Sequence, residues 1–358
     1  MSLTSNIKRS LVPLYQQHAR KLHELTYIFF ELTNECNLTC LHCGSDCIKD
    51  SGVPNLPAEK VLGVLVDIKS KNDPHKISVV LSGGEPLCYP HVFQLGRQIT
   101  ELEFPWGMVT NGYAWNQKRV RQAKESGMCS ATVSLDGLAD THDWLRGRQG
   151  SYNKAVNAIS LLIDENFLQA IDVITCANRR NLNQLEAIAD KLVALGLKEW
   201  RIFTISPIGR ATEFSDLFLS PSEYNHLLTT IRRLRERSDI AVRLSESGYL
   251  GKHHELDVRD QYFFCRAGIS VAGVMVNGDI LACPNIDRRF RQGNIHQDSF
   301  MDVWEHKYQV FRDRAWMRVG RCKDCGEWRN CQGNSFHLWN LDKNEPKLCH
   351  CRDYELIA

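Results

Sequence analysis

The chain has 358 residues, 43% hydrophobic and 24% charged, with a formal net charge of +2. This is an ordinary globular composition, and the length fits an α/β barrel of about 200–250 residues plus a smaller module. Basic and acidic residues are interspersed, which argues against a nucleic-acid-binding face. Because no apolar run of about 18 residues occurs and Met1–Lys21 lacks a signal-peptide core, we expect no membrane span and a cytoplasmic protein.

Short apolar runs alternate with amphipathic stretches through the first two thirds of the chain. The expected strands are Tyr27–Leu32, Lys76–Leu81, Trp106–Thr110, Ser130–Leu135, Ala170–Thr175 and Glu199–Ile205. Apolar residues at i, i+3, i+4 spacing predict helices such as Ala58–Ser70, Lys118–Ser126, Ser151–Asn166 and Leu182–Leu195. This alternation implies parallel strands joined by right-handed crossovers, and predicts a partial, TIM-like (β/α)6 barrel of the α/β class.

The alternation of predicted strands and helices ends between Arg237 and Cys265, where a cysteine-rich and loop-rich tail begins. We therefore predict three parts: an N-terminal extension over 1–21, the partial barrel over 22–237, and a small cysteine-rich domain over 238–358. In α/β folds the chemistry lies in loops that follow the carboxyl ends of strands, so we expect the site there.

Fourteen cysteines are too many for disulfides in a reducing cytoplasm. Metal ligation is the other use that groups cysteines at short, fixed spacings. The first group, Cys36, Cys40 and Cys43, has the spacing C-x3-C-x2-C directly after an expected strand. Three thiolates can hold three irons of a cubane and leave the fourth iron open to a cofactor, as an open position does in catalytic zinc sites. A structural zinc with His42 or Cys47 as fourth ligand is the alternative.

This loop resembles the signature of the radical S-adenosylmethionine (SAM) superfamily, which has a histidine or aromatic residue before the last cysteine. The resemblance implies a [4Fe–4S] cluster on Cys36, Cys40 and Cys43 whose open iron binds SAM. It further implies reductive cleavage of SAM to a 5′-deoxyadenosyl radical, with electrons from a donor such as flavodoxin or ferredoxin.

Further motifs match the family in order, so that the resemblance covers Thr26 to Ile208. Ser82-Gly83-Gly84-Glu85-Pro86 looks like the turn that meets the SAM amino group. Glycines permit a close backbone approach there, and Glu85 complements an ammonium. The SAM-binding residues that the resemblance implies are His42, Gly83, Gly84, Glu85, Pro86, Ser134 and Arg146, the last two toward the ribose and the carboxylate.

The tail resembles the SPASM domain, a C-terminal extension of radical SAM enzymes that modify peptides or proteins. Its ligand pattern is matched by Cys265, Cys283, Cys322, Cys325, Cys331, Cys349 and Cys351, and implies auxiliary [4Fe–4S] clusters. Ser335 stands where the pattern has a further cysteine.

We interpret Cys322, Cys325, Cys331 and one of Cys349 and Cys351 as the ligands of an outer cluster. Cys265 and Cys283 would hold an inner cluster with the other member of that pair, since residues on either side of one residue point to the same face of an extended segment. The alternatives are an inner cluster that is incomplete, open to substrate or absent, and a zinc knuckle on Cys322 and Cys325.

The family resemblance implies an oxidoreductase that abstracts hydrogen from a peptide or protein substrate. Relatives that make formylglycine place an aspartate after the second tail cysteine, whereas Pro284 follows Cys283 here and Asp287 lies three residues further on. That weakens the formylglycine hypothesis. A haem- or small-molecule-modifying enzyme and a zinc-binding interaction protein are two further hypotheses. The stretches 21–25 and 41–47 resemble a lipoprotein-associated subfamily, and no catalytic side chain is assigned.

Overall fold

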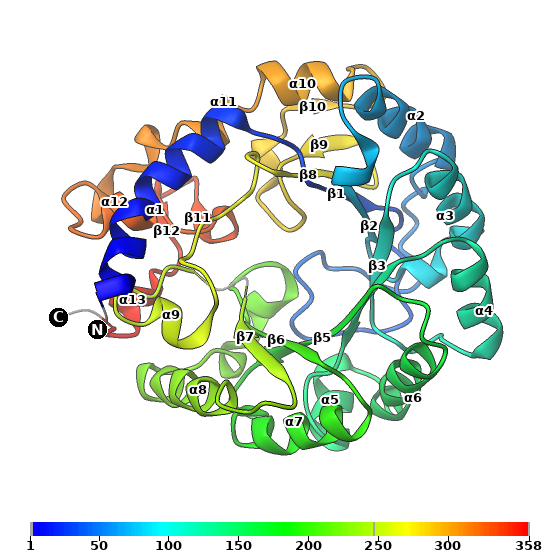
Figure 1. Cartoon of the computed structure of the whole chain (residues 1–358), viewed down its shortest axis with the longest axis horizontal. Coiled ribbons are helices and arrows are strands. Elements are labelled where there is room, and N and C mark those ends of the chain that lie inside the picture. The colour runs from blue at the N-terminus through cyan, green and yellow to red at the C-terminus, as the bar shows by residue number, and fades with distance from the viewer. Residues whose placement is uncertain (1–2, 246–247, 357–358) are drawn as a thin grey trace.

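The computed structural model describes residues 3–245 and 248–356 (Figure 1). Residues 1, 2, 246, 247, 357 and 358, which fall in the predicted N-terminal extension and C-terminal domain, lie outside the described residues. The first helix, α1 (Leu3–Leu22), runs beside the C-terminal region, where the Gln16 side chain donates to the Asn330 carbonyl at 3.1 Å. None of the described helices has the length and apolarity needed to cross a membrane.

The centre of the fold is a curved parallel sheet with helices on its outer face (Figure 1). Its parallel strands, in both chain order and spatial order, are β1 (Tyr27–Glu31), β2 (Ser78–Ser82), β3 (Trp106–Thr110), β4 (Ser130–Ser134), β5 (Ala170–Ala177), β6 (Glu199–Thr204) and β7 (Ala241–Leu244). The predicted α/β partial barrel is confirmed. The sheet contains two parallel strands more than the six expected: β7 pairs with β6 beyond Arg237, and a strand of the C-terminal region pairs in parallel with β1.

The C-terminal region extends the same sheet at its other edge. β8 (Val271–Val274) pairs in parallel with β1, and β9 (Asp279–Leu281) and β10 (Gly293–Asn294) follow as antiparallel strands. In the part of the chain that the structure describes, β10 and β7 are the two edges, so the barrel stays open. The predicted division at 237 and 238 stays a prediction, since one sheet spans both sides of it.

Crossover helices cover the outside of the sheet. They are α2 (Ala58–Lys69), α3 (Val92–Glu101), α4 (Gln117–Glu125), α5 (Ala139–Arg146), α6 (Ser151–Asp164), α7 (Leu185–Ala194) and α8 (Pro221–Leu234). Shorter elements complete the C-terminal region: α9 (Glu255–Val258), α10 (Phe300–His306), α11 (Gln309–Arg312), α12 (Trp328–Cys331), α13 (His350–Asp353), and the β11 (Trp339–Asn340) and β12 (Glu345–Pro346) pair.

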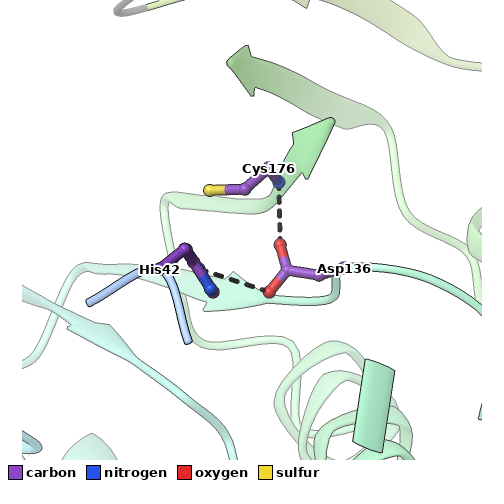
Figure 2. Close-up of side chains that lie close together, drawn as sticks. All are labelled: His42, Asp136 and Cys176. Atoms are coloured by element: carbon purple, nitrogen blue, oxygen red, sulfur yellow. Dashed lines mark hydrogen bonds and ion pairs between the residues drawn. The ribbon is translucent and has the colours of Figure 1, made fainter. Parts of the chain in front are cut away.

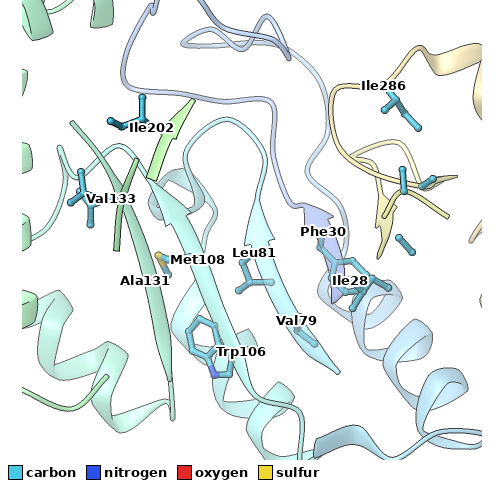
Figure 3. Close-up of a cluster of buried hydrophobic side chains, with 14 of the residues drawn as sticks. Ile28, Phe30, Val79, Leu81, Trp106, Met108, Ala131, Val133, Ile202 and Ile286 are labelled. Carbon is cyan, nitrogen blue, oxygen red and sulfur yellow. The ribbon is translucent and has the colours of Figure 1, made fainter. Parts of the chain in front are cut away.

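Alternation along the strands separates the core from the barrel interior. Ile28 and Phe30 of β1 are fully buried in the layer between sheet and helices, together with Val79 and Leu81 of β2 (Figure 3). Glu31 is the next residue after Phe30, so it faces the interior of the barrel, where its carboxylate pairs with Arg288 at 3.1 Å. The carboxyl end of the sheet is thus polar inside and apolar outside.

A glycine in α3 makes room for the buried indole ring of Trp106. A Cβ placed on Gly96 would lie 2.1 Å from the ring of Trp106. The indole cannot move aside, because its nitrogen donates to Thr100 Oγ1 at 3.1 Å and to the Ser126 carbonyl at 3.2 Å.

We expect Gly96→Ala to lower the free energy of unfolding by about 1–3 kcal/mol through overpacking. Gly63→Ala is the matched control, since Gly63 lies within α2 with nothing within 4 Å of an added Cβ. There, helix propensity alone should raise stability by about 1 kcal/mol. Urea unfolding of both variants measures the difference, and a Gly96→Ala protein as stable as the unaltered chain would contradict this packing.

Candidate active site

The first cysteine loop leaves the end of β1 and is closed on itself by the backbone. The Cys36 amide donates to the Ile48 carbonyl at 3.0 Å, which ties the two ends of the loop together. Between them, Cys36, Cys40 and Cys47 are buried in one cluster, with Cys43 packed against it. The structure therefore brings the three predicted cluster ligands together.

These thiols are suited to bind metal. Cys36, Cys40 and Cys43 are all free of disulfides. Burial raises the pKa of Cys36 to about 12, whereas a hydrogen bond from the Cys47 thiol lowers the pKa of Cys43 to about 6. Three cysteine side chains gathered in one loop, two of them buried, fit a site that a cationic iron centre completes. Cys47, whose role the sequence left open, acts here as a donor to Cys43.

The glycine turn after β2 is pressed against the backbone of the cysteine loop. The Gly84 amide donates to the Thr33 carbonyl at 2.7 Å, and the Glu85 amide donates to the Glu35 carbonyl at 2.9 Å. A Cβ on Gly83 would lie 2.4 Å from the Thr33 oxygen, and one on Gly84 would lie 2.1 Å from the Glu35 oxygen. The close approach expected for these glycines is thus one between two loops of the chain itself.

Glu85 is buried and held by the end of β3. Its carboxylate accepts from Thr110 Oγ1 at 2.7 Å and from the Asn111 amide at 2.8 Å. Burial raises the pKa of Glu85, although these hydrogen bonds oppose the rise. Asn111 in turn reaches Cys36, with 3.7 Å from Nδ2 to Sγ. Asn111 directly follows the predicted strand Trp106–Thr110 and is not among the site residues that the sequence indicated.

A second polar group lies at the carboxyl ends of β4 and β5 (Figure 2). Asp136 is fully buried and accepts from Arg146 Nε at 2.6 Å and from the Cys176 amide at 2.7 Å. Burial would raise the pKa of Asp136, but the positive charge of Arg146 holds it below its usual value. Arg146 NH1 also lies 3.7 Å from Cys40 Sγ. The predicted SAM-binding arginine is therefore placed between a carboxylate and a cluster cysteine.

His42 and Cys176 complete this group. The ligand atoms of His42, Asp136 and Cys176 lie within 4.8 Å of one another, close enough to share a metal ion. The Arg146 guanidinium already neutralises Asp136, which disfavours a cation at this place. Burial lowers the pKa of His42 to about 4, and its Nδ1 has no hydrogen-bond partner among the described residues. The Nε2 of His42 lies 3.8 Å from the Asp136 carboxylate (Figure 2), so Nδ1 is the imidazole atom that could contact a bound cofactor.

Two further observations concern the rim of the site. Ser134, predicted from its strand end, lies buried at the end of β4. Arg210, which no motif indicated, donates to the carbonyls of Cys40 at 2.8 Å and Cys47 at 2.9 Å. The glycine before it has φ +54°, and a Cβ there would lie 2.4 Å from the Cys43 oxygen. The only sequence signal for these contacts of Arg210 is the run Pro207-Ile208-Gly209-Arg210, which follows a predicted strand.

In the C-terminal region, five cysteines line one cavity: Cys322, Cys325, Cys331, Cys349 and Cys351. Cys349 Sγ and Cys351 Sγ lie 3.6 Å apart, and a hydrogen bond from Cys351 lowers the pKa of Cys349 to about 7. Burial raises the pKa of Cys331 well above its usual value. Arg321 and Arg352 border the same cavity and offset negative charge on the thiolates.

Two polar residues follow Cys283 closely in the chain, Asn285 and Asp287. The Ser45 hydroxyl donates to Asn285 Oδ1, so Asn285 contacts the first cysteine loop. Asp287 instead pairs with Arg289 at 2.7 Å, and that contact lowers the pKa of its carboxyl. Asn285, two residues after Cys283, is therefore the nearer of the two to the site.

Comparison with known proteins gives the same two modules. The radical SAM superfamily model matches residues 30–192, and the model of the SPASM iron–sulfur cluster-binding domain matches residues 265–326. The chain is 25% identical to the AdoMet-dependent heme synthase of Methanosarcina barkeri, over 86% of this chain and 90% of that one. It is 29% identical to the mycofactocin maturase of Mycolicibacterium smegmatis, over 89% of this chain and 80% of that one.

Among solved structures, native anSMEcpe with bound AdoMet and a Cp18Cys peptide superposes with a TM-score of 0.71 at 16% identity, covering 93% of this chain and 95% of that one. This likeness concerns the fold.

The chain therefore belongs to the radical SAM superfamily and carries a SPASM domain. It is an enzyme, and its cofactors are SAM and [4Fe–4S] clusters, one for SAM and one or two auxiliary. The residues described above fit that assignment: three disulfide-free thiols in one loop, two of them buried, with a guanidinium and an imidazole whose Nδ1 has no partner among the described residues beside them.

The buried Arg146–Asp136 pair yields a stability prediction. Asp136→Asn leaves Arg146 buried without a carboxylate, and we expect the free energy of unfolding to fall by about 3–5 kcal/mol. Glu103→Gln is the control, because Glu103 pairs with Lys69 at the surface and should cost less than about 1 kcal/mol. Urea unfolding of anaerobically purified protein measures both, and equal effects would refute the role given to the buried pair.

Proposed function

We propose that this enzyme abstracts a hydrogen atom from a peptide or protein substrate, as part of peptide maturation. The observation that carries the proposal is the pairing of a SAM-type cysteine loop with a SPASM module in a chain 29% identical to a mycofactocin maturase. A peptide-bound enzyme of the same fold supports it. An electron donor such as flavodoxin or ferredoxin belongs to the proposal, as does a cytoplasmic setting, since fourteen free cysteines suit a reducing compartment.

The chain's own residues would prepare the reaction by position and charge. Cys36, Cys40 and Cys43 would hold the SAM cluster, and that cluster, when bound, supplies the electron that cleaves SAM. Arg146, paired with Asp136 and in contact with Cys40, would place guanidinium N–H donors beside the cluster loop, where a carboxylate could accept from them. Neutral His42 would offer Nδ1 to the bound cofactor.

The glycine turn and Ser134 complete the proposed SAM site. Gly83, Gly84 and Pro86 fix the turn against the cysteine loop, and Glu85 is held at its end. An ammonium group at this position would meet the buried carboxylate of Glu85 and lower its pKa from the raised value. No side chain of this chain is assigned as an acid or base that would act on the substrate.

A second candidate, modification of a porphyrin, is favoured by a different observation. The match with the Methanosarcina barkeri heme synthase covers 86% of this chain and 90% of that protein, so the two proteins align over most of their lengths. The formylglycine hypothesis is not favoured, because Pro284 follows Cys283 and the carboxylate of Asp287 already forms an ion pair with Arg289.

The cluster assignment is tested by two cysteine variants of the reconstituted enzyme. Cys40→Ala should abolish formation of 5′-deoxyadenosine from SAM and dithionite, because the SAM cluster loses a ligand. Cys325→Ala should keep this uncoupled cleavage and lose product formation. Cys129→Ala, at a strand start away from both groups, is the control and should change neither. SAM cleavage by purified Cys40→Ala protein would overturn the assignment.

The substrate class is tested by coupling. We expect peptides encoded beside the gene to raise the rate of 5′-deoxyadenosine formation above the uncoupled rate and to lose hydrogen mass in the product, read by mass spectrometry. Porphyrins supplied in place of peptide should leave the rate unchanged. The reverse result, stimulation by a porphyrin alone, would replace the peptide proposal with the second candidate.

A further inference from the structure

The SPASM pattern provides ligands for two auxiliary clusters, but the thiols of this chain are unevenly divided. Cys322, Cys325, Cys331, Cys349 and Cys351 all line a single cavity. Cys349 and Cys351 are adjacent there, 3.6 Å apart at their sulfurs. A [4Fe–4S] cluster with all four irons ligated by the protein takes four thiolates, so this cavity holds one such cluster's ligands and one thiol more.

The inner position of the pattern is left with two cysteines, Cys265 and Cys283. Ser335 stands at the place of the third cysteine, and its hydroxyl already makes hydrogen bonds within the chain. It caps the short 3-10 helix Phe336–Leu338 by accepting from the His337 amide at 3.3 Å, and it shares a hydrogen bond with His337 Nδ1 at 3.0 Å. A neutral hydroxyl is also a much harder ligand than the thiolates that iron–sulfur clusters select.

Polar side chains already join the segments that an inner cluster would join. Arg314 is 3% exposed and donates to the Cys265 carbonyl at 3.0 Å and to the Asn334 carbonyl, beside Ser335, at 3.2 Å. His337 Nε2 bonds the carbonyl of Pro284, beside Cys283, at 2.8 Å. Hydrogen bonds thus connect the Cys265 and Cys283 segments to the Ser335 segment.

We propose that this chain holds a single auxiliary [4Fe–4S] cluster, on four of the five thiols of the C-terminal cavity, and that Cys265, Cys283 and Ser335 hold none. This differs from the division expected from the sequence, in which Cys349 and Cys351 serve different clusters. With the SAM cluster, the enzyme contains two clusters. The proposal concerns ligand sets alone and is independent of the substrate.

The test is the iron and labile sulfide content of the anaerobically reconstituted full chain, with a Mössbauer spectrum. We expect about eight irons and about eight sulfides per chain. The double variant Cys265→Ala/Cys283→Ala should retain about eight of each, with an unchanged spectrum. About twelve irons in the unaltered chain, or a loss of about four in this double variant, would overturn the proposal.

A companion triple variant tests the cavity itself. Cys325→Ala/Cys349→Ala/Cys351→Ala leaves two thiols there, fewer than the three that hold the SAM cluster, and we expect the iron content to fall to about four per chain with the SAM cluster retained. The control Cys129→Ala should keep about eight irons. Retention of about eight irons by Cys325→Ala/Cys349→Ala/Cys351→Ala would overturn the placement of the cluster. All these readouts are made without substrate, so a failure of the peptide proposal leaves them unaffected.

Discussion

The buried ion pair between Arg146 and Asp136 is the constraint around which the SAM end of the barrel is arranged. It joins α5 to the end of β4, and Asp136 also accepts from the Cys176 amide on β5. Arg146 then extends to Cys40, so one guanidinium connects two strands, a helix and the cysteine loop. A buried charge of this kind is costly unless it is fully paired, which fixes the geometry of every element that touches it.

The cysteine loop itself has no regular structure, so its shape depends on its surroundings. The glycine turn after β2 packs on one side of it, Asn111 from β3 contacts Cys36, and Arg210 from beyond β6 holds two of its carbonyls. Each contact comes from the carboxyl end of a different strand. This arrangement explains why a parallel sheet suits the site: adjacent strands deliver their following loops to one edge.

The sequence predicted those features that depend on local pattern. Strand β3 was predicted with the bounds Trp106–Thr110 that the structure has, and the other five strands within about two residues, because alternating or continuous apolar runs identify a buried strand. Cysteine spacing located the first loop for the same reason. Helix α5 was missed, since its face is made of His142, Asp143 and Arg146, buried polar residues that carry no apolar period.

The features that could not be predicted are contacts between distant segments. Nothing in the run around Arg210 indicates that its side chain reaches Cys40, 170 positions earlier. β8 joins the edge of β1 although more than 200 residues separate them in the chain.

The pairing of β8 with β1 sets where the C-terminal region lies relative to the barrel. Because β8 and β9 continue the barrel sheet, the segment after Cys283 is delivered to the mouth of the barrel, where Asn285 contacts the first cysteine loop and Arg288 pairs with Glu31. The same sheet thus includes strands from both parts of the chain, and the contacts of Asn285 and Arg288 tie the C-terminal region to the end of the barrel where the first cysteine loop lies.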